Sequence, residues 1–168
     1  NFTHDKKQTL SGLFHDIATP AFKHCIDFLN GDYMNQESTE ELTKTLIKDS
    51  KDIMKLLERD DIKLEEVCDY HIYPIADNDT PMLSADRLEY SLSNDLIVFK
   101  TNTLEDIREI YNDIEVQTNE NEIIELGFKT KKIARQFVKN TSRLSVAYRD
   151  DATRFYMQAI ADILKKVS

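Results

Sequence analysis

Residues 10–29 read LSGLFHDIATPAFKHCIDFL and predict two helices joined by a proline turn. Apolar side chains recur at helical spacing on both sides of that turn, which is typical of helices that bury one face. The first helix is expected to end near His15 and Asp16. Pro20 suits the first turn of the second helix, because its missing N–H costs nothing there. Asn30-Gly31-Asp32 is expected to close the second helix, since glycine is favoured just after a helix end.

Helical patterns continue from this stretch to the end of the chain. Helix N-caps are indicated at three places, namely Ser38-x-x-Glu41, Ser84 and Thr103-x-x-Asp106. Further helical patterns lie around 42–47, around 53–57, from Leu64 onward, from 84 to about 98, from 104 to 114, around 133–148 and around 155–167. Residues 72–82 hold two prolines and several Asp and Asn, and are expected to form a loop.

The fold class that follows is all-α, with one short β-hairpin. Only 3 Gly and 3 Pro occur in 168 residues, which favours long helices over a many-turned β fold. The hairpin is expected near 115–128, where Val116 and the apolar residues 123–126 flank Asn119-Glu120-Asn121. A chain of this length suits a single domain.

Charge and cysteine content narrow the function classes. The net charge of −9 argues against a surface that coats nucleic acid, although a local basic pocket for phosphate remains compatible with it. No apolar run approaches the roughly 20 residues of a membrane span. Cys25 and Cys68 lack metal-thiolate spacing, so we expect reduced thiols in a cytoplasmic protein.

His15, Asp16 and Asp86 are the candidate ligands of one divalent metal ion. An adjacent His-Asp pair can converge on one ion where a helix loosens at its end. Asp86 would add a carboxylate from the first turn of another helix, and such a ligand set leaves positions open for water and substrate. Each residue also has a structural alternative: Asp16 as a helix cap, Asp86 as a partner of its own helix dipole, and His15 as a histidine at a helix end.

At these residues the chain resembles the HD-domain superfamily of metal-dependent phosphohydrolases, closest to its deoxynucleotide triphosphohydrolase branch. That branch carries H-D-x-G-H-x-P-F-x-H and a later D-R/K-x-D-Y helix. The residues that match are His15, Asp16, Phe22, His24, Asp86, Arg87 and Tyr90. The resemblance implies an HD-type helical bundle over residues 1–168, with a metal-site core at 1–98 and a helical extension at 99–168.

The resemblance also implies roles for four further side chains. His24 and Asp27 would be catalytic, with the carboxylate orienting the imidazole one helical turn away. Arg87 and Tyr90 would bind substrate, through phosphate and sugar. The alternatives are an ordinary exposed pair for His24 and Asp27, an ion pair of Arg87 with Glu89 or a neighbouring helix, and core packing for Tyr90.

Several positions depart from the family pattern. Ala18 and Thr19 replace a Gly and an active-site His, Asn94 stands where relatives carry Asp, and Asn35-Gln36-Glu37 lies nearest to a lost His-Glu pair. The family has one more metal-ligand His upstream. His4 is 11 residues before His15, about 16 Å along a helix, so we expect it on the surface. The missing ligand is expected to precede Asn1.

The function that these residues imply is hydrolysis of a phosphoester or phosphoanhydride, with a small nucleotide as substrate. The ion could be Mn, Fe, Mg, Zn, Co or Ni, because all accept His and carboxylate ligands. A homo-oligomer is compatible with the sequence. The alternative is a catalytically degenerate HD domain that binds a nucleotide or a partner, which the departures at Thr19 and Asn94 motivate.

Overall fold

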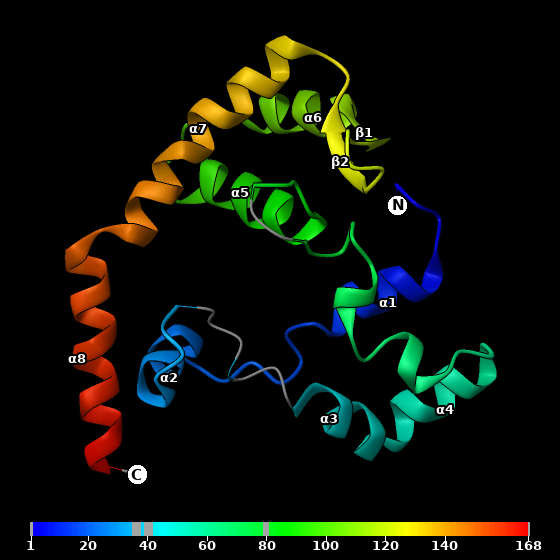
Figure 1. The fold of residues 1–168 in the computed structure, drawn as a ribbon, viewed down its shortest axis with the longest axis vertical. Helices are drawn as coiled ribbons and strands as arrows, with labels where there is room; N and C mark the ends of the chain where they lie inside the picture. Colours follow the sequence, from blue (N-terminus) through cyan, green and yellow to red (C-terminus); the bar gives the residue numbers. More distant parts are fainter. Residues whose placement is uncertain (1, 35–37, 39–41, 79–80, 168) are drawn as a thin grey trace. The chain divides into compact units, whose positions relative to one another are not determined.

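The computed structural model describes residues 2–34, 38, 42–78 and 81–167, and these residues are mostly helical (Figure 1). The predicted all-α class with one short hairpin is confirmed. The α-helices in the described residues are α1 (Lys6–Phe14), α2 (Lys23–Asn30), α3 (Thr43–Asp49), α4 (Lys51–Arg59), α5 (Ala85–Ile97), α6 (Leu104–Asp113), α7 (Lys131–Arg149) and α8 (Asp151–Val167). None of them combines the length and the apolar character that crossing a membrane requires.

The chain divides into two compact units, each built from two separate segments. Unit 1 comprises residues 1–12 and 70–146, and unit 2 comprises residues 13–69 and 147–168. The boundary between the units falls within α1, after Gly12, and within α7, after Val146. Each unit is therefore closed by residues that are far apart in sequence.

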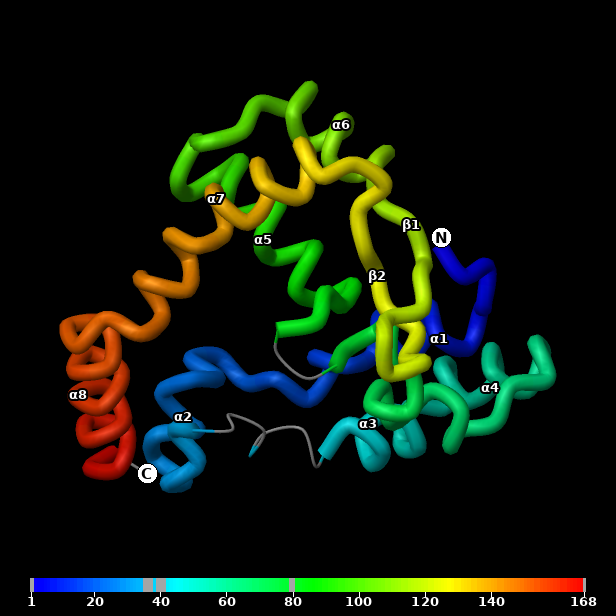
Figure 2. Tube along the Cα trace, turned by 45° about the horizontal axis from the view of Figure 1, so that its top comes forward, coloured from blue at the N-terminus to red at the C-terminus, as the bar shows by residue number. Residues whose placement is uncertain are grey.

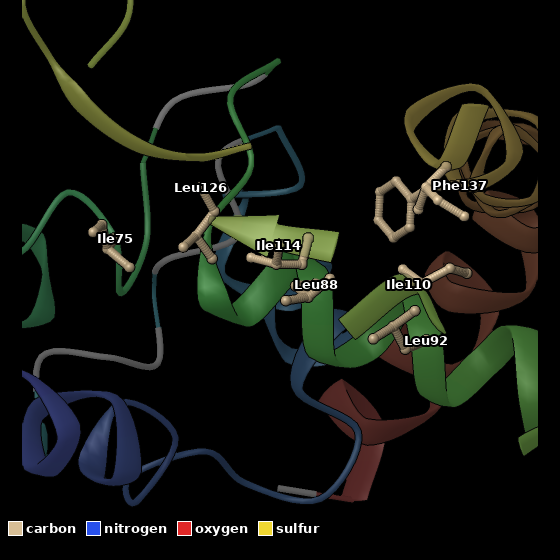
Figure 3. Close-up of a cluster of buried hydrophobic side chains, with 8 residues drawn as sticks. Ile75, Leu88, Leu92, Ile110, Ile114, Leu126 and Phe137 are labelled. Carbon is tan, nitrogen blue, oxygen red and sulfur yellow. The ribbon is translucent and has the colours of Figure 1, made fainter. Parts of the chain in front are cut away.

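Unit 1 holds a hydrophobic core between α5, α6, α7 and the hairpin (Figure 3). The strands β1 (Ile114–Thr118) and β2 (Ile124–Phe128) lie side by side (Figure 2) and pair antiparallel, which confirms the predicted hairpin. Val116 is paired with Leu126. The buried members of the core are Ile75, Leu88, Leu92, Ile110, Ile114, Leu126, Ile133 and Phe137. Leu88 and Leu92 of α5 are four residues apart, as are Ile133 and Phe137 of α7, so one face of each of these two helices supplies the core.

Local sequence signals set the boundaries of α5 and α6. The Ser84 hydroxyl accepts from the Arg87 amide at 3.1 Å, which makes it the predicted N-cap of α5. Thr103 and Asp106 form a reciprocal capping box at the start of α6, also as predicted. The cap indicated at Ser38-x-x-Glu41 involves residues outside the described part of the chain.

Unit 2 is organised around the packing of α2 against α8 (Figure 2). The Arg154 guanidinium of α8 lies 6.0 Å from the ring centres of both Phe28 and Tyr33, a cation–π arrangement that ties the two helices together. Gly31 ends α2 with φ +79°, so the predicted glycine cap is confirmed. Helices α3 and α4 pack against one another in the same unit.

Two predictions of helix starts are wrong. Pro20 does not open α2: the chain turns first, and the helix begins at Lys23 after Phe22 takes the left-handed conformation (φ 63°, ψ 37°). A left-handed residue cannot continue a right-handed helix, so α2 starts only after it. Residues Leu64–Glu66 form a single 3₁₀ turn in place of a longer helix.

A buried polar network joins the end of α5 to α7 within unit 1. Asp95 is fully buried, and its Oδ2 accepts from Asn102 Nδ2 at 3.1 Å. Asn102 in turn accepts from Asn140 of α7 at 2.8 Å. Asp95 Oδ1 is buried without a hydrogen-bond donor among the described residues. Burial raises the pKa of Asp95, although Thr101 and Arg143 partly oppose the rise.

This raised pKa predicts the sign of a pH effect on stability. A carboxyl group with a raised pKa in the folded state stabilises the fold below its ordinary pKa of 3.8 and loses that contribution as the pH rises through the raised value. Asp95→Asn removes the ionisation, so the stability of the variant relative to the parent should improve from about pH 4 to about pH 7.5. Urea unfolding at both pH values measures this.

Asp106→Asn is the control with the opposite sign. The hydrogen bonds from Thr103 lower the pKa of Asp106, so its contribution is present above pH 3.8 and is lost at lower pH. Its replacement should cost most stability at neutral pH. If the stability difference for Asp95→Asn did not change with pH, the assigned effect of burial would be wrong.

Candidate functional site

His15 and Asp16 lie directly after the end of α1. The helix stops at Phe14, and the Ile17 and Thr19 amides close consecutive tight turns onto Phe14 and Asp16 at 3.0 Å each. The two side chains therefore leave the regular helical spacing and turn toward one another. His15 Nε2 lies 3.1 Å from Asp16 Oδ2. Both residues belong to unit 2, and their convergence on one ion stays a prediction.

The surroundings of Asp16 keep its side chain ionised. Thr19 Oγ1 donates to Asp16 Oδ1 at 2.7 Å, and Lys23 Nζ lies 3.5 Å from the same oxygen. Partial burial alone would push the pKa of Asp16 upward. The hydrogen bond from Thr19 and the neighbouring basic groups outweigh burial, so this pKa lies below its ordinary value of 3.8.

This pair fits two neighbouring positions around a divalent ion. Ligand atoms about 2.1 Å from one ion lie roughly 3.0 to 3.4 Å apart in octahedral or tetrahedral geometry. The separation of 3.1 Å between His15 Nε2 and Asp16 Oδ2 is within that range. An ionised carboxylate and an imidazole are also suitable donors. Within the described ranges, no group of three or more His, Cys, Asp or Glu is gathered closely enough to hold an ion.

The other predicted metal ligand, Asp86, belongs to unit 1, whereas His15 and Asp16 belong to unit 2. Asp86 is the second residue of α5, and its amide donates to the Ala76 carbonyl at 3.3 Å. Its role as a ligand stays a prediction. His4 is exposed, as the helical distance from His15 indicated.

His24 and Asp27 face one another across one turn of α2. His24 Nδ1 lies 3.6 Å from Asp27 Oδ2, and the imidazole is 53% exposed while the carboxylate is 0% exposed. Asp27 Oδ1 accepts from Ser38 at 2.8 Å, and Oδ2 has no hydrogen-bond donor among the described residues. The alternative of an ordinary exposed pair is therefore wrong for the carboxylate, which is buried.

The burial of Asp27 has an energetic consequence. A buried carboxylate is costly unless its oxygens are compensated by charges or hydrogen bonds. Among the described residues, the basic group that lies beside Asp27 Oδ2 is the His24 ring, with Nδ1 at 3.6 Å. Because Nδ1 faces the carboxylate, Nε2 is the ring nitrogen left for another partner.

Arg87 anchors the loop that precedes α5. Its guanidinium donates three hydrogen bonds, to Asp77 Oδ1 at 3.0 Å, to Asn78 Oδ1 at 3.1 Å and to the Met82 carbonyl at 3.1 Å. Arginine has five N–H donors, and the described partners occupy three of them. The ion-pair partner of Arg87 is Asp77 and not Glu89, whose carboxylate accepts from Ser93 at 2.6 Å.

Tyr90 is partly buried on α5, one turn after Arg87. Its carbonyl accepts from the Asn94 side chain at 2.7 Å, so Asn94 bonds to the backbone of its own helix. The proposed contact of Tyr90 with a sugar stays a prediction. Asn35-Gln36-Glu37, compared above with a lost His-Glu pair, lies outside the described residues.

Sequence reasoning missed three polar partners of the candidate residues. Lys23 forms an ion pair with Asp16, and Asp77 forms one with Arg87. Ser38 donates a hydrogen bond to Asp27. The separations are seven, ten and eleven residues, and all three pairs bridge turns or loops without a periodic pattern. Of these three partners, only Lys23 could have been found from the sequence, since it lies inside the stretch that carries the candidate histidines.

No family model, no curated protein and no solved structure matches the chain.

Proposed function

We propose that the protein is a metal-dependent phosphohydrolase that cleaves a phosphoester or phosphoanhydride, with a small nucleotide as the first substrate class to test. The observation that carries the proposal is the pair formed by the buried Asp27 carboxylate and the exposed His24 ring. A carboxylate placed beside a single imidazole is an arrangement by which proteins orient a catalytic histidine.

His24 is the proton donor in this proposal. Asp27 Oδ2 lies 3.6 Å from Nδ1 and orients the ring, so Nε2 is the nitrogen from which a proton would pass to a leaving oxygen. The exposure of the ring supports this role, because a donor must reach a bound substrate. Ser38 satisfies the second carboxylate oxygen and limits the rotation of Asp27.

His15 and Asp16 would hold the divalent ion, and Asp86 stays the predicted further ligand. When bound, such an ion lowers the pKa of a coordinated water and offsets phosphate charge. Lys23 adds a second positive charge beside Asp16, which favours an anionic substrate at this place. The hydrogen bond from Thr19 occupies one lone pair of Asp16 and keeps Oδ2 on the side of His15.

The hydrogen bond from Thr19 also favours the second candidate, a non-catalytic module. Thr19 stands where the resembled family has an active-site histidine, and here its side chain is used to hold Asp16. A site that keeps its ion ligands but not this histidine could bind a nucleotide without turning it over.

Metal content and phosphate release on the full-length protein test the proposal. We expect about one ion per chain and metal-dependent turnover on at least one of a panel of nucleotides and a generic phosphodiester. Asp16→Ala should lower metal affinity and turnover by at least about 100-fold, since losing even an outer-shell partner costs 10- to 100-fold. Asp52→Ala, which removes an exposed carboxylate of α4 in the same unit, is the matched control.

The outcomes separate the candidates. A bound ion without turnover on any substrate would favour the non-catalytic module. The absence of bound metal in the parent, or equal activity in Asp16→Ala and Asp52→Ala, would contradict a metal site at His15 and Asp16.

A further inference from the structure

Helix α7 is strongly basic in an acidic protein. Its sequence, KKIARQFVKNTSRLSVAYR, contains six Lys and Arg and no Asp or Glu. The whole chain carries a net charge of −9. The basic residues of α7 have no role in the proposed phosphohydrolase site, so their function is a separate question.

Five of these basic side chains lie together on one face within unit 1, and we name them the basic stripe: Lys131, Lys132, Arg135, Lys139 and Arg143. At 100° per residue they fall within an arc of about 120°. The opposite face of α7 carries Ile133, Phe137 and Leu144, which are buried. All five members of the stripe are exposed. From Lys131 to Arg143 the stripe spans about 18 Å along the helix axis.

The stripe is weakly neutralised by the protein itself. In the part of the chain that the structure describes, its one ion pair joins Lys132 to Glu109 at 3.9 Å, between two largely exposed side chains. Arg143 also attracts the buried Asp95. An ion pair between exposed side chains, such as that of Lys132 with Glu109, contributes little to stability. The positive charge of the stripe is therefore directed mainly to solvent.

Helix stability does not account for the stripe. The first turn of α7 holds Lys131 and Lys132 and no acidic residue. A positive charge at a helix N-terminus opposes the helix dipole and destabilises the helix. The neighbouring like charges on one face also repel one another. The arrangement therefore reduces the stability of the isolated helix, and an anionic partner would reverse that cost.

We propose that the basic stripe binds the sugar-phosphate backbone of a nucleic acid without reading its sequence. Phosphates are contacted chiefly by Lys and Arg, and they are spaced along one direction as the stripe is. A protein partner is less suitable, because protein interfaces are depleted of Lys and depend on aromatic anchors, which this face lacks. An anionic membrane is less suitable because peripheral helices add apolar side chains such as Phe or Leu to their charge.

The net charge of −9 restricts this interaction to the stripe. Acidic residues elsewhere repel phosphates, which confines the expected contact to the stripe. Binding is expected to be weak at physiological salt and clear at low salt, since the attraction comes from the release of counterions.

Fluorescence anisotropy of the full chain with a labelled duplex DNA of mixed sequence, at salt concentrations from about 25 to 200 mM, tests the inference. With about four phosphate contacts, log K should fall against log salt with a slope near −3.6. The triple variant Lys131→Gln, Arg135→Gln, Lys139→Gln should reduce the magnitude of that slope by about three, one for each contact removed. Gln is a good helix former, so circular dichroism should show unchanged helicity.

The matched control replaces three exposed lysines of α3 and α4, namely Lys48→Gln, Lys51→Gln and Lys55→Gln, which gives the same net charge. This control should keep the slope of the parent. The inference is overturned if the parent does not bind duplex at the lowest salt, if both triple variants lose binding equally, or if the stripe variant binds as the parent does. Binding to phosphatidylserine vesicles but not to duplex would also overturn it.

Discussion

Replacing His24 with Gln is expected to lower the kcat of phosphate release by about 10²- to 10⁴-fold, with a much smaller change in KM. Gln keeps hydrogen-bonding capacity at the surface of α2 but cannot carry the proton that the imidazole carries. Because the His24 side chain is 53% exposed, the substitution should leave the fold intact. Steady-state kinetics and thermal unfolding of the same preparations measure the two effects.

Two further variants make the test specific. His71→Gln changes another exposed histidine, which stacks on Tyr70 with ring centres 4.2 Å apart, and should leave kcat unchanged. Asp27→Asn keeps the shape of the buried side chain and its contact with Ser38 but removes the charge, so kcat should fall less than in His24→Gln. If His24→Gln and His71→Gln had equal kcat, His24 would not be the proton donor.

The largest expected loss of stability follows from Ile110→Ala. Ile110 is 0% exposed and belongs to the core of unit 1, where α5, α6, α7 and the hairpin meet. Removing its branched side chain leaves a cavity, and such changes lower the free energy of unfolding by about 2–5 kcal/mol. Urea unfolding followed by far-ultraviolet circular dichroism measures the loss.

Ile97→Ala is the control for this prediction. Ile97 lies at the end of α5 in the same unit and is 68% exposed, so its truncation should change the free energy of unfolding by no more than about 0.5 kcal/mol. Equal losses in the two variants would show that the buried cluster does not hold unit 1 together.

The candidate site was predictable where its geometry is local. The adjacency of His15 and Asp16 at a helix end, and the spacing of His24 and Asp27 by one helical turn, both follow from the residues alone. The burial of Asp27 could not be predicted, because it arises from Ser38 and from packing between segments distant in sequence. The contacts of Arg87 were likewise missed, since they cross an irregular loop.

The same division applies to the fold. Helix caps at Ser84 and Thr103, the glycine end of α2 and the hairpin after α6 depend on hydrogen bonds and backbone preferences within a few residues, and short stretches of sequence are enough to predict them. The late start of α2 required the left-handed Phe22, a conformation that no local preference of phenylalanine favours.

Only the folded chain decides that residues 147–168 complete the unit that begins at residue 13, while residues 70–146 form another with the N-terminal segment. In both units, helices pack through apolar faces, and the apolar residues of these helices recur with the same spacing in the sequence. Which face meets which is determined by the complementarity of their packed side chains, and not by the periodicity that makes each of them a helix.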